Sequence, residues 1–176
     1  MARGVNVPIA LNDMEVYING VNSLSGIAEV ELPNVENSTV TSEQIGMSSE
    51  FEVPLIGHFK KLETKIKMDC VDDTMLTFNN GSALDVECKG SIQLIDKITH
   101  AAKFRGVDVS LRGLIKKMDG FKVKPGAKLE GSIEMSVSYY KLEINGKTIT
   151  EIDVLNNISN TNGHTNDTIR RQLGLI

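Results

Sequence analysis

The sequence contains no tryptophan, and aromatic residues make up only 5% of its 176 residues. A hydrophobic core must therefore rely on valine, isoleucine, leucine and methionine. No apolar stretch approaches the ~20 residues of a membrane-spanning helix, and the first fourteen residues lack the sustained apolar segment of a secretory signal. We therefore expect a protein that is made and kept in a cytoplasm and does not insert stably into a membrane as a monomer.

Cysteine and histidine are scarce, which argues against a metal site. The chain has two cysteines, Cys70 and Cys88, and three histidines, His58, His100 and His164. Structural zinc sites usually show ligands in close pairs, whereas these residues are far apart in the sequence. Both cysteines continue apolar stripes, so we predict two reduced thiols in the core, no metal and no cofactor.

Sequence motifs of catalysis are lacking as well. The stretch "GSIQLID" (90–96) has no second glycine and is not a nucleophile elbow, and no glycine-rich phosphate-binding motif occurs. Asp72 and Asp73 are more typical of a helix N-cap than of a catalytic carboxylate pair. The lysines of "FKKLETKIK" (59–67) have no interleaved aromatic residues for base stacking, and the net charge is −4. The sequence predicts a protein that is not an enzyme.

Alternation of apolar and polar residues dominates the rest of the chain, as expected for β-strands with one buried face. The clearest stripe consists of Leu84, Val86, Cys88, Ile92 and Leu94. Asn-Gly pairs at 19–20 and 145–146 predict tight hairpin turns. One short helix is expected within residues 70–81, "CVDDTMLTFNNG". The pattern predicts a single mainly-β domain over residues 1–176, an antiparallel β-sandwich or barrel with one short α-helix.

Two segments fit poorly into a compact monomer. Residues 33–60 are too long for an ordinary loop and read as an interaction loop, and residues 155–176 form a polar tail with an apolar end. Apolar side chains in such segments often mark interfaces. We therefore predict contacts between subunits through two groups of residues: Val53, Pro54, Leu55 and Ile56, and Leu173, Leu175 and Ile176.

The run "EMSVSYYKLEING" (134–146) changes its apolar phase in the middle. Met135, Val137 and Tyr139 share one face, but after Tyr140 the other face becomes apolar. A flat strand with one dry face cannot give this pattern, because side chains alternate with a period of two. Either a bulge shifts the register, or different partners cover the two halves of the strand. The two explanations are compatible.

At "VSYYKLEINGKTITEID" (137–153) the sequence resembles the major tail tube proteins of contractile-tailed bacteriophages and of R-type bacteriocins. The stretches "GMSSEFEVPLIGHFKKLE" (46–63), "LRGLIKKMDG" (111–120) and "RRQLGL" (170–175) resemble further parts of that family. The resemblance covers nearly the whole chain, and its Tyr-Tyr segment is the most specific part.

The resemblance implies hexameric rings with a continuous inner β-barrel, stacked into a hollow tube that is driven through a target envelope and conducts DNA or ions. The implied partners are other copies of the chain and the tail sheath, tape measure, baseplate and tail terminator proteins. The implied location is a virion tail or a bacteriocin particle assembled in the host bacterial cytoplasm. In such a ring Tyr139 and Tyr140 are expected at a contact between subunits. The alternative is a baseplate or adaptor protein of the same assembly with a related fold.

A tube that passes DNA favours a lumen of negative charge, because cationic side chains would hold the phosphate backbone. Glu29 and Glu31 alternate with apolar neighbours and are predicted to face the lumen, with the lysines of residues 61–67 pointing away from it. The pair Asp85 and Glu87, or Asp108, could serve equally.

Overall fold

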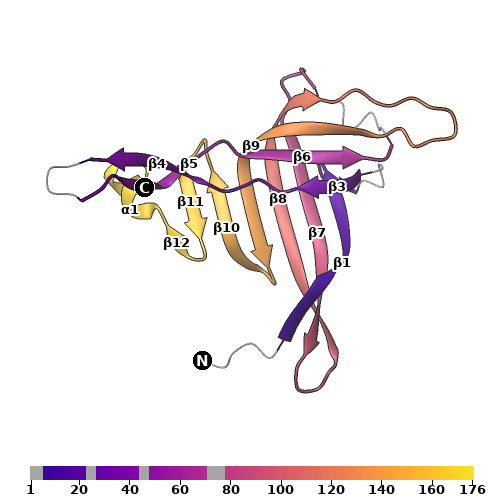
Figure 1. The fold of residues 1–176 in the computed structure, drawn as a ribbon, viewed down its shortest axis with the longest axis horizontal. Helices are drawn as coiled ribbons and strands as arrows, with labels where there is room; N and C mark the ends of the chain where they lie inside the picture. Colours follow the sequence, from indigo (N-terminus) through magenta and orange to yellow (C-terminus); the bar gives the residue numbers. More distant parts are fainter. Residues whose placement is uncertain (1–5, 23–26, 44–47, 71–77) are drawn as a thin grey trace.

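The computed structural model describes residues 6–22, 27–43, 48–70 and 78–176, in which antiparallel strands predominate (Figure 1). The elements are β1 (Asn6–Ile18), β2 (Val21–Asn22), β3 (Ile27–Glu31), β4 (Asn37–Ser42), β5 (Phe51–Phe59), β6 (Glu63–Met68), β7 (Leu84–Asp96), β8 (Ala102–Met118), β9 (Gly131–Ile144), β10 (Lys147–Asp153), β11 (Ile158–Thr161), β12 (His164–Thr165) and α1 (Asp167–Gln172). The mainly-β, antiparallel fold predicted from alternation is confirmed.

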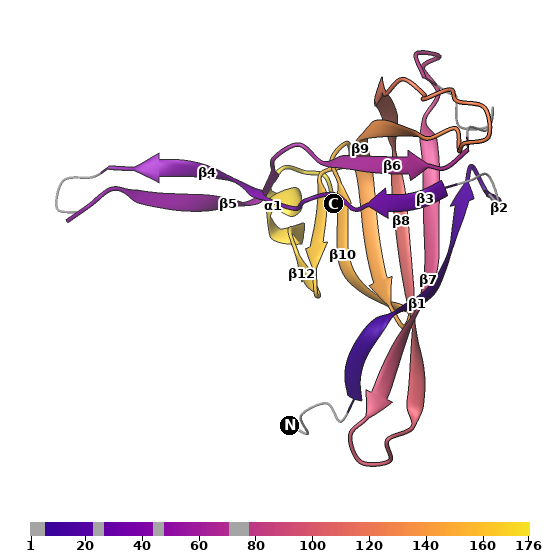
Figure 2. The same cartoon turned by 45° about the vertical axis from the view of Figure 1, so that its right-hand side comes forward.

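Ten strands form one sheet that folds over on itself. Its main path runs β12-β11-β10-β9-β8-β7-β1-β2, while β6 pairs with β9 and carries β3 on its other edge. Figures 1 and 2 show β3 and β6 crossing over the upper part of β7 and β8 at a steep angle. We call β3, β6 and the first half of β9 the short layer, and β1, β7, β8, the second half of β9 and β10 to β12 the long layer. The core lies between the two layers, as in orthogonally packed sheets.

Strand β9 belongs to both layers because its partner changes along its length. Its first half pairs with β6, from Glu63↔Ser136 to Met68↔Gly131, and its second half pairs with β10. Between them the Val137 amide donates to the Leu62 carbonyl (2.9 Å), and the Ser138 carbonyl accepts from the Val154 amide (2.9 Å). The other edge of β9 follows β8 throughout.

A bulge at Ser138 marks this change of partner. Arg112 lies opposite Tyr139 and Gly113 opposite Val137, which leaves Ser138 as an extra residue in β9. The extra residue reverses the alternation, so Tyr140 is buried while Tyr139 points to the other face. Both explanations of the phase change, a bulge and a change of partner, are therefore correct. The shift lies one residue earlier than the tyrosine pair, so Tyr139 does not share a face with Val137.

The core is aliphatic and draws on both layers. Its buried members are Val16, Ile18, Leu62, Ile66, Met68, Leu84, Val86, Cys88, Val109, Leu111, Ile133, Met135, Val137, Tyr140 and Ile152. The predicted stripe of β7 is confirmed, with Ile92 only half-buried. The two predicted Asn-Gly turns are also confirmed, since all four residues have positive φ and connect β1 to β2 and β9 to β10.

Three expectations need correction or a different location. The predicted helix falls mostly on residues 71–77, which lie outside the described residues, whereas the helix that is described, α1, was not predicted. Residues 33–60 do not form a plain loop, because β4 and β5 pair into a separate two-stranded ribbon. Cys70 is exposed and not a core residue, because β6 ends at Met68 and the apolar stripe ends with it.

The bulge gives a stability test at Gly113. A Cβ added there would lie 2.0 Å from the carbonyl oxygen of Ser136, so the backbones of β8 and β9 would have to move apart. We expect Gly113→Ala to lower the free energy of unfolding by about 1–3 kcal/mol, the usual range for overpacking, in denaturant titrations of the unassembled protomer. Gly106→Ala in the same strand is the matched control, because no atom lies within 4 Å of its added Cβ. Equal effects of the two substitutions would refute the close approach.

Candidate assembly surfaces

The candidate functional features of this chain are surfaces. Among the described residues no group of three or more His, Cys, Asp or Glu side chains could hold a metal ion. In the same part of the chain no helix has the length and apolar character needed to cross a membrane. The surfaces below are built from cross-strand rows, because residues opposite one another in an antiparallel pair point to the same side.

The outer side of the long layer, which we call the polar face, consists of three rows. They are Asp85–Arg112–Tyr139–Asp153, Tyr17–Glu87–Ser110–Lys141–Glu151 and Glu15–Lys89–Asp108–Glu143–Thr148. In these rows seven carboxylates stand against three cations, which gives the polar face a formal charge of −4. Alternation of acidic and apolar residues in β7, such as Asp85 and Glu87, was the sequence signal for this face.

Contacts within the polar face fix its side chains. Arg112 binds the Asp85 carboxylate (2.8 Å) and lies 6.0 Å from the centre of the Tyr139 ring. The Tyr139 hydroxyl donates to Glu151 (3.1 Å). Burial, followed by the hydrogen bond to Glu151, raises the pKa of Tyr139 to about 12. Tyr139 is therefore a neutral hydrogen-bond donor that holds a carboxylate in place.

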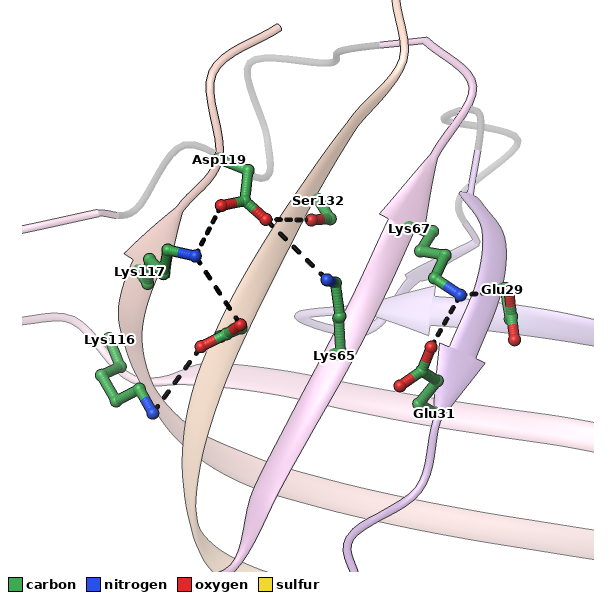
Figure 3. A network of polar contacts seen from close by, with 9 residues as sticks. Glu29, Glu31, Lys65, Lys67, Lys116, Lys117, Asp119 and Ser132 are labelled. Carbon is green, nitrogen blue, oxygen red and sulfur yellow. Dashed lines mark hydrogen bonds and ion pairs between the residues drawn. The ribbon is translucent and has the colours of Figure 1, made fainter.

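The outer side of the short layer carries a network of ion pairs (Figure 3). Lys67 binds both Glu29 (2.9 Å) and Glu31 (2.7 Å), and these contacts raise the pKa of Lys67. We call this surface the ion-pair face; its charged members are Glu29, Glu31, Lys61, Glu63, Lys65, Lys67, Lys116, Lys117, Asp119 and Glu134. Five carboxylates against five cations leave it neutral. Exposed pairs of this kind contribute little to stability individually.

The ion-pair face corrects one expectation. Glu29 and Glu31 were predicted to face the lumen and the lysines of residues 61–67 to point away from it, but the register pairs Glu29 with Lys67 and Glu31 with Lys65. Carboxylates and lysines therefore share one face. The sequence gives the alternation within each strand but not which strands are neighbours, so this pairing was not visible in it.

We call residues 33–60 the arm; its described parts, residues 33–43 and 48–60, project away from the two layers (Figure 2). Cross-strand pairs place Val40, Val53 and Phe51 on one side of the ribbon and Thr39, Thr41 and Glu52 on the other. The Thr39 hydroxyl donates to Glu52 (2.7 Å), which fixes the polar side. Val40, Phe51 and Val53 are exposed.

The predicted contact residues of the arm lie partly on its apolar side. Val53 belongs to that side, and Pro54 pairs with Thr39 on the opposite one. Leu55 and Ile56 follow in the irregular stretch between the pairs Thr39↔Pro54 and Asn37↔Phe59. All four side chains are exposed, Ile56 to 69%. Their role in subunit contacts stays a prediction.

The tail, residues 155–176, continues the sheet through β11 and β12 and ends in α1. The buried Asn166 anchors it. Its backbone N–H donates to the Ser159 carbonyl (3.0 Å), its side-chain Oδ1 accepts from the Ser159 amide (2.9 Å), and its Nδ2 donates to the Asn157 carbonyl (3.0 Å). Asn166 lies against the base of the arm, where a Cβ on Gly57 would be 3.6 Å away. Leu173, Leu175 and Ile176 beyond α1 are more than half exposed.

Tyr140 was predicted at a subunit contact, and the structure contradicts this. Its side chain is only 5% exposed and packs in the core of the protomer, because the bulge at Ser138 turns it inward. Tyr139, on the polar face, stays a candidate. Two features were missed entirely: the three-row polar face as a unit, and an apolar groove between β1 and β3.

The hairpin of β7 and β8 extends beyond the short layer (Figures 1 and 2). Its turn is closed by Asp96, which accepts hydrogen bonds from the amides of Ile98 (2.8 Å) and Thr99 (3.1 Å) and binds Lys103 (2.7 Å). Lys103, then the two amides, lower the pKa of Asp96 to about 2. The end of this hairpin is thus a defined structure with a basic character.

Comparisons with known proteins show the family of this chain. The family profile described as phage tail tube protein FII matches residues 8–174. The chain is similar to the tail tube protein of Escherichia phage P2, with 28% identity over 175 residues, 96% of this chain and 99% of that protein. It is also similar to the major tail tube protein of Serratia phage KSP20, with 25% identity over 157 residues, 89% of this chain and 90% of that protein. The residues matched by the profile include both layers, the arm and most of the tail.

The two cysteines give a direct test of the core. Cys70 is exposed, whereas Cys88 is buried and its burial raises the pKa of the thiol to about 11. We expect a thiol reagent at pH 8 to modify one cysteine per native protomer and the second only after unfolding, because the thiolate is the reactive form. Mass spectrometry of the labelled peptides identifies the site, and Cys70→Ser is the control that should abolish native labelling. Rapid native modification of Cys88 would contradict the core assignment.

Proposed function

The chain belongs to the phage tail tube protein FII family and is a structural component of a phage tail tube; from this premise we propose that its copies close into hexameric rings and that the rings stack into a hollow tube. The proposal extends to a contractile tail or a phage-tail-like bacteriocin, in which the tube is driven through the target envelope. A tube of this kind acts mechanically, so the chain is proposed to have no catalytic activity.

The observation that carries the proposal is the pair of open edges of the long layer. In the described part of the chain the main path of the sheet ends at β2 on one side and at β12 on the other, while β3 leaves a further free edge on the short layer. Open edges are ready to pair with another chain, and a closed barrel removes them. Edge-to-edge pairing between neighbouring copies would join six long layers into one continuous inner barrel.

The polar face is the best candidate for the lining of that barrel. Its charge of −4 per copy would repel the phosphate backbone of DNA weakly at every ring, whereas cationic side chains would retain it. The earlier candidates Glu29 and Glu31 share their face with Lys65 and Lys67, which cancels most of their charge. We therefore favour Asp85, Glu87 and Asp108 over Glu29 and Glu31 as lumen residues.

The remaining partners follow from the position of a tube in such a particle. The sheath protein would surround the tube, the tape measure protein would occupy the lumen during assembly, and the baseplate and terminator proteins would cover its two ends. Assembly would take place in the cytoplasm of the host bacterium, before release of the particle.

Electron microscopy of the purified full-length protein, with a tail truncation beside it, tests the proposed tube. We expect the full chain to form long tubes of stacked rings. Deletion of residues 173–176 removes three exposed apolar side chains, so it should leave a folded protomer with an unchanged circular dichroism spectrum that assembles poorly. Val123→Ser changes another exposed apolar residue, outside the arm and tail, and should form tubes normally.

Two outcomes would contradict this prediction. If the full chain gives only single rings or monomers under all conditions, the tube proposal fails and an adaptor protein is favoured. If the truncated chain forms tubes as readily as the full chain, the contact role of Leu173, Leu175 and Ile176 fails alone.

The lumen assignment is tested by reversing charge on the polar face. We expect tubes of the double variant Glu87→Lys and Asp108→Lys to bind linear duplex DNA in a salt-dependent manner, while wild-type tubes bind none. Covalently closed circles of the same length should not bind, because they have no end that can enter a lumen. Tubes of the control variant Glu29→Lys and Glu31→Lys should bind linear and circular DNA equally. Binding of circles by the polar-face variant would place that face on the outer wall.

A further inference from the structure

An apolar groove lies on the inner side of the long layer, where the short layer ends. It encloses about 630 Å³ between β1 and β3. Its floor includes Ile92, Val107 and Leu142, and its walls include Leu11 from β1 and Leu32, which follows β3. Leu11 is 50% exposed and Leu32 41% exposed. None of the described residues fills this groove.

The groove results from the unequal length of the two layers. Strands β7 and β8 continue past β3 while keeping their inward apolar phase, and Ile92 and Val107 line the groove together with Ala28 and Val30 of β3. Gly90 lies beside the groove and lets two of its lining side chains approach, since a Cβ there would lie 2.9 Å from the Leu11 side chain and 3.1 Å from the Val107 side chain. The surface is therefore shaped as well as apolar.

The arm is a second unpartnered apolar surface, and it is amphipathic. Val40, Phe51 and Val53 share one side of the ribbon, opposite Thr39, Thr41 and Glu52. A two-stranded ribbon is marginally stable in water by itself. Covering its apolar side with another apolar surface would stabilise it.

The arm and the groove of one protomer cannot meet. Figures 1 and 2 both show the arm projecting beyond β11 and β12, whereas β1 and β3 lie at the opposite side of the molecule. A contact between them must join two copies. Such a contact uses two different patches and repeats head to tail, which is the geometry that generates closed rings or extended stacks.

Charge favours the arm over the tail as the occupant. The arm carries Glu36, Glu43, Glu50 and Glu52 against Lys60, a charge of −3. The β7–β8 hairpin at the lower end of the groove carries Lys97, Lys103 and Arg105 against Asp96, a charge of +2. The tail has Arg170 and Arg171 beside its apolar end and would be repelled there.

Two charges near the ends of these surfaces have no ion pair within the described residues. They are Glu50, next to β5 at the far end of the arm, and Arg105, which lies opposite Ile92 at the groove. Complementary charges of this kind set the orientation of an interface more than its strength.

We propose that the arm of one copy lies in the apolar groove of a neighbouring copy, with Val40, Phe51 and Val53 on the groove floor and Glu50 toward Arg105. The inference rests on the proposed self-assembly and adds which two surfaces form one of its contacts.

Disulfide cross-linking in the assembled tube tests the contact. In a Cys70→Ser background, the chain carrying Val53→Cys and Leu11→Cys should give a ladder of covalent multimers after mild oxidation, seen on a non-reducing denaturing gel. A mixture of the two single-cysteine chains should give dimers only. The matched control pairs Thr41→Cys, on the polar side of the same ribbon, with Leu11→Cys and should stay monomeric.

A charge exchange tests the orientation independently. Arg105→Glu should raise the protein concentration needed for tube formation by about tenfold, the effect of one interfacial charge pair. Adding Glu50→Arg to the same chain should restore assembly near the wild-type concentration. Additive losses in the double variant would overturn the proposed orientation.

The outcomes separate this inference from the proposed function. Absence of tubes from the wild-type chain would remove the proposed function. Wild-type tubes with no Val53–Leu11 cross-link, or with equal cross-linking from Thr41, would overturn the arm-in-groove contact alone. An intrachain link between Met75→Cys and Leu11→Cys, with the arm unreactive, would assign the groove to residues 71–77 of the same chain.

Discussion

The structure depends on one constraint: a β-strand has only two edges, and β9 divides one of them between two partners. Strand β8 occupies its first edge along the whole length, while β6 and β10 share the second on either side of Ser138. This division creates the two layers and the core between them. It also brings Leu62, just after the arm, and Val154, just before the tail, to neighbouring hydrogen bonds. The arm and the tail therefore leave the body of the protein from one place.

Sequence alternation predicted the strands well where one strand keeps one dry face. The stripe of β7 with Cys88 and the Asn-Gly turns are examples, because both depend on interactions close in the sequence. Alternation failed where the outcome depends on which strands are neighbours. It could not show that Lys67 would sit between Glu29 and Glu31, or that β6 would end before Cys70. A six-residue helix such as α1 is also too short to show a helical period.

The surfaces of the protomer differ in how many of their charged and apolar side chains have a partner within the protomer. On the ion-pair face carboxylates and lysines satisfy one another, and on the polar face Arg112 and Tyr139 hold carboxylates that still leave a surplus of negative charge. The polar side of the arm has such partners, such as Thr39 with Glu52, but the apolar side of the arm and the groove remain exposed in the described structure. The apolar residues of the arm and of the groove are visible in the sequence. Their exposure follows from the short layer being shorter than the long layer. Only the three-dimensional structure shows that difference.

The ion-pair face has a mechanical consequence. Its charges are already neutralised by close partners, and at physiological salt the field of such pairs decays within about 8 Å. A second surface brought against it would gain little attraction and meet little repulsion. If this face forms the outer wall of a tube, the wall is hydrated and adheres only weakly to a surrounding protein. A rod with such a wall could slide inside a surrounding sleeve without first breaking strong contacts, so the work of a stroke would remain available for penetration.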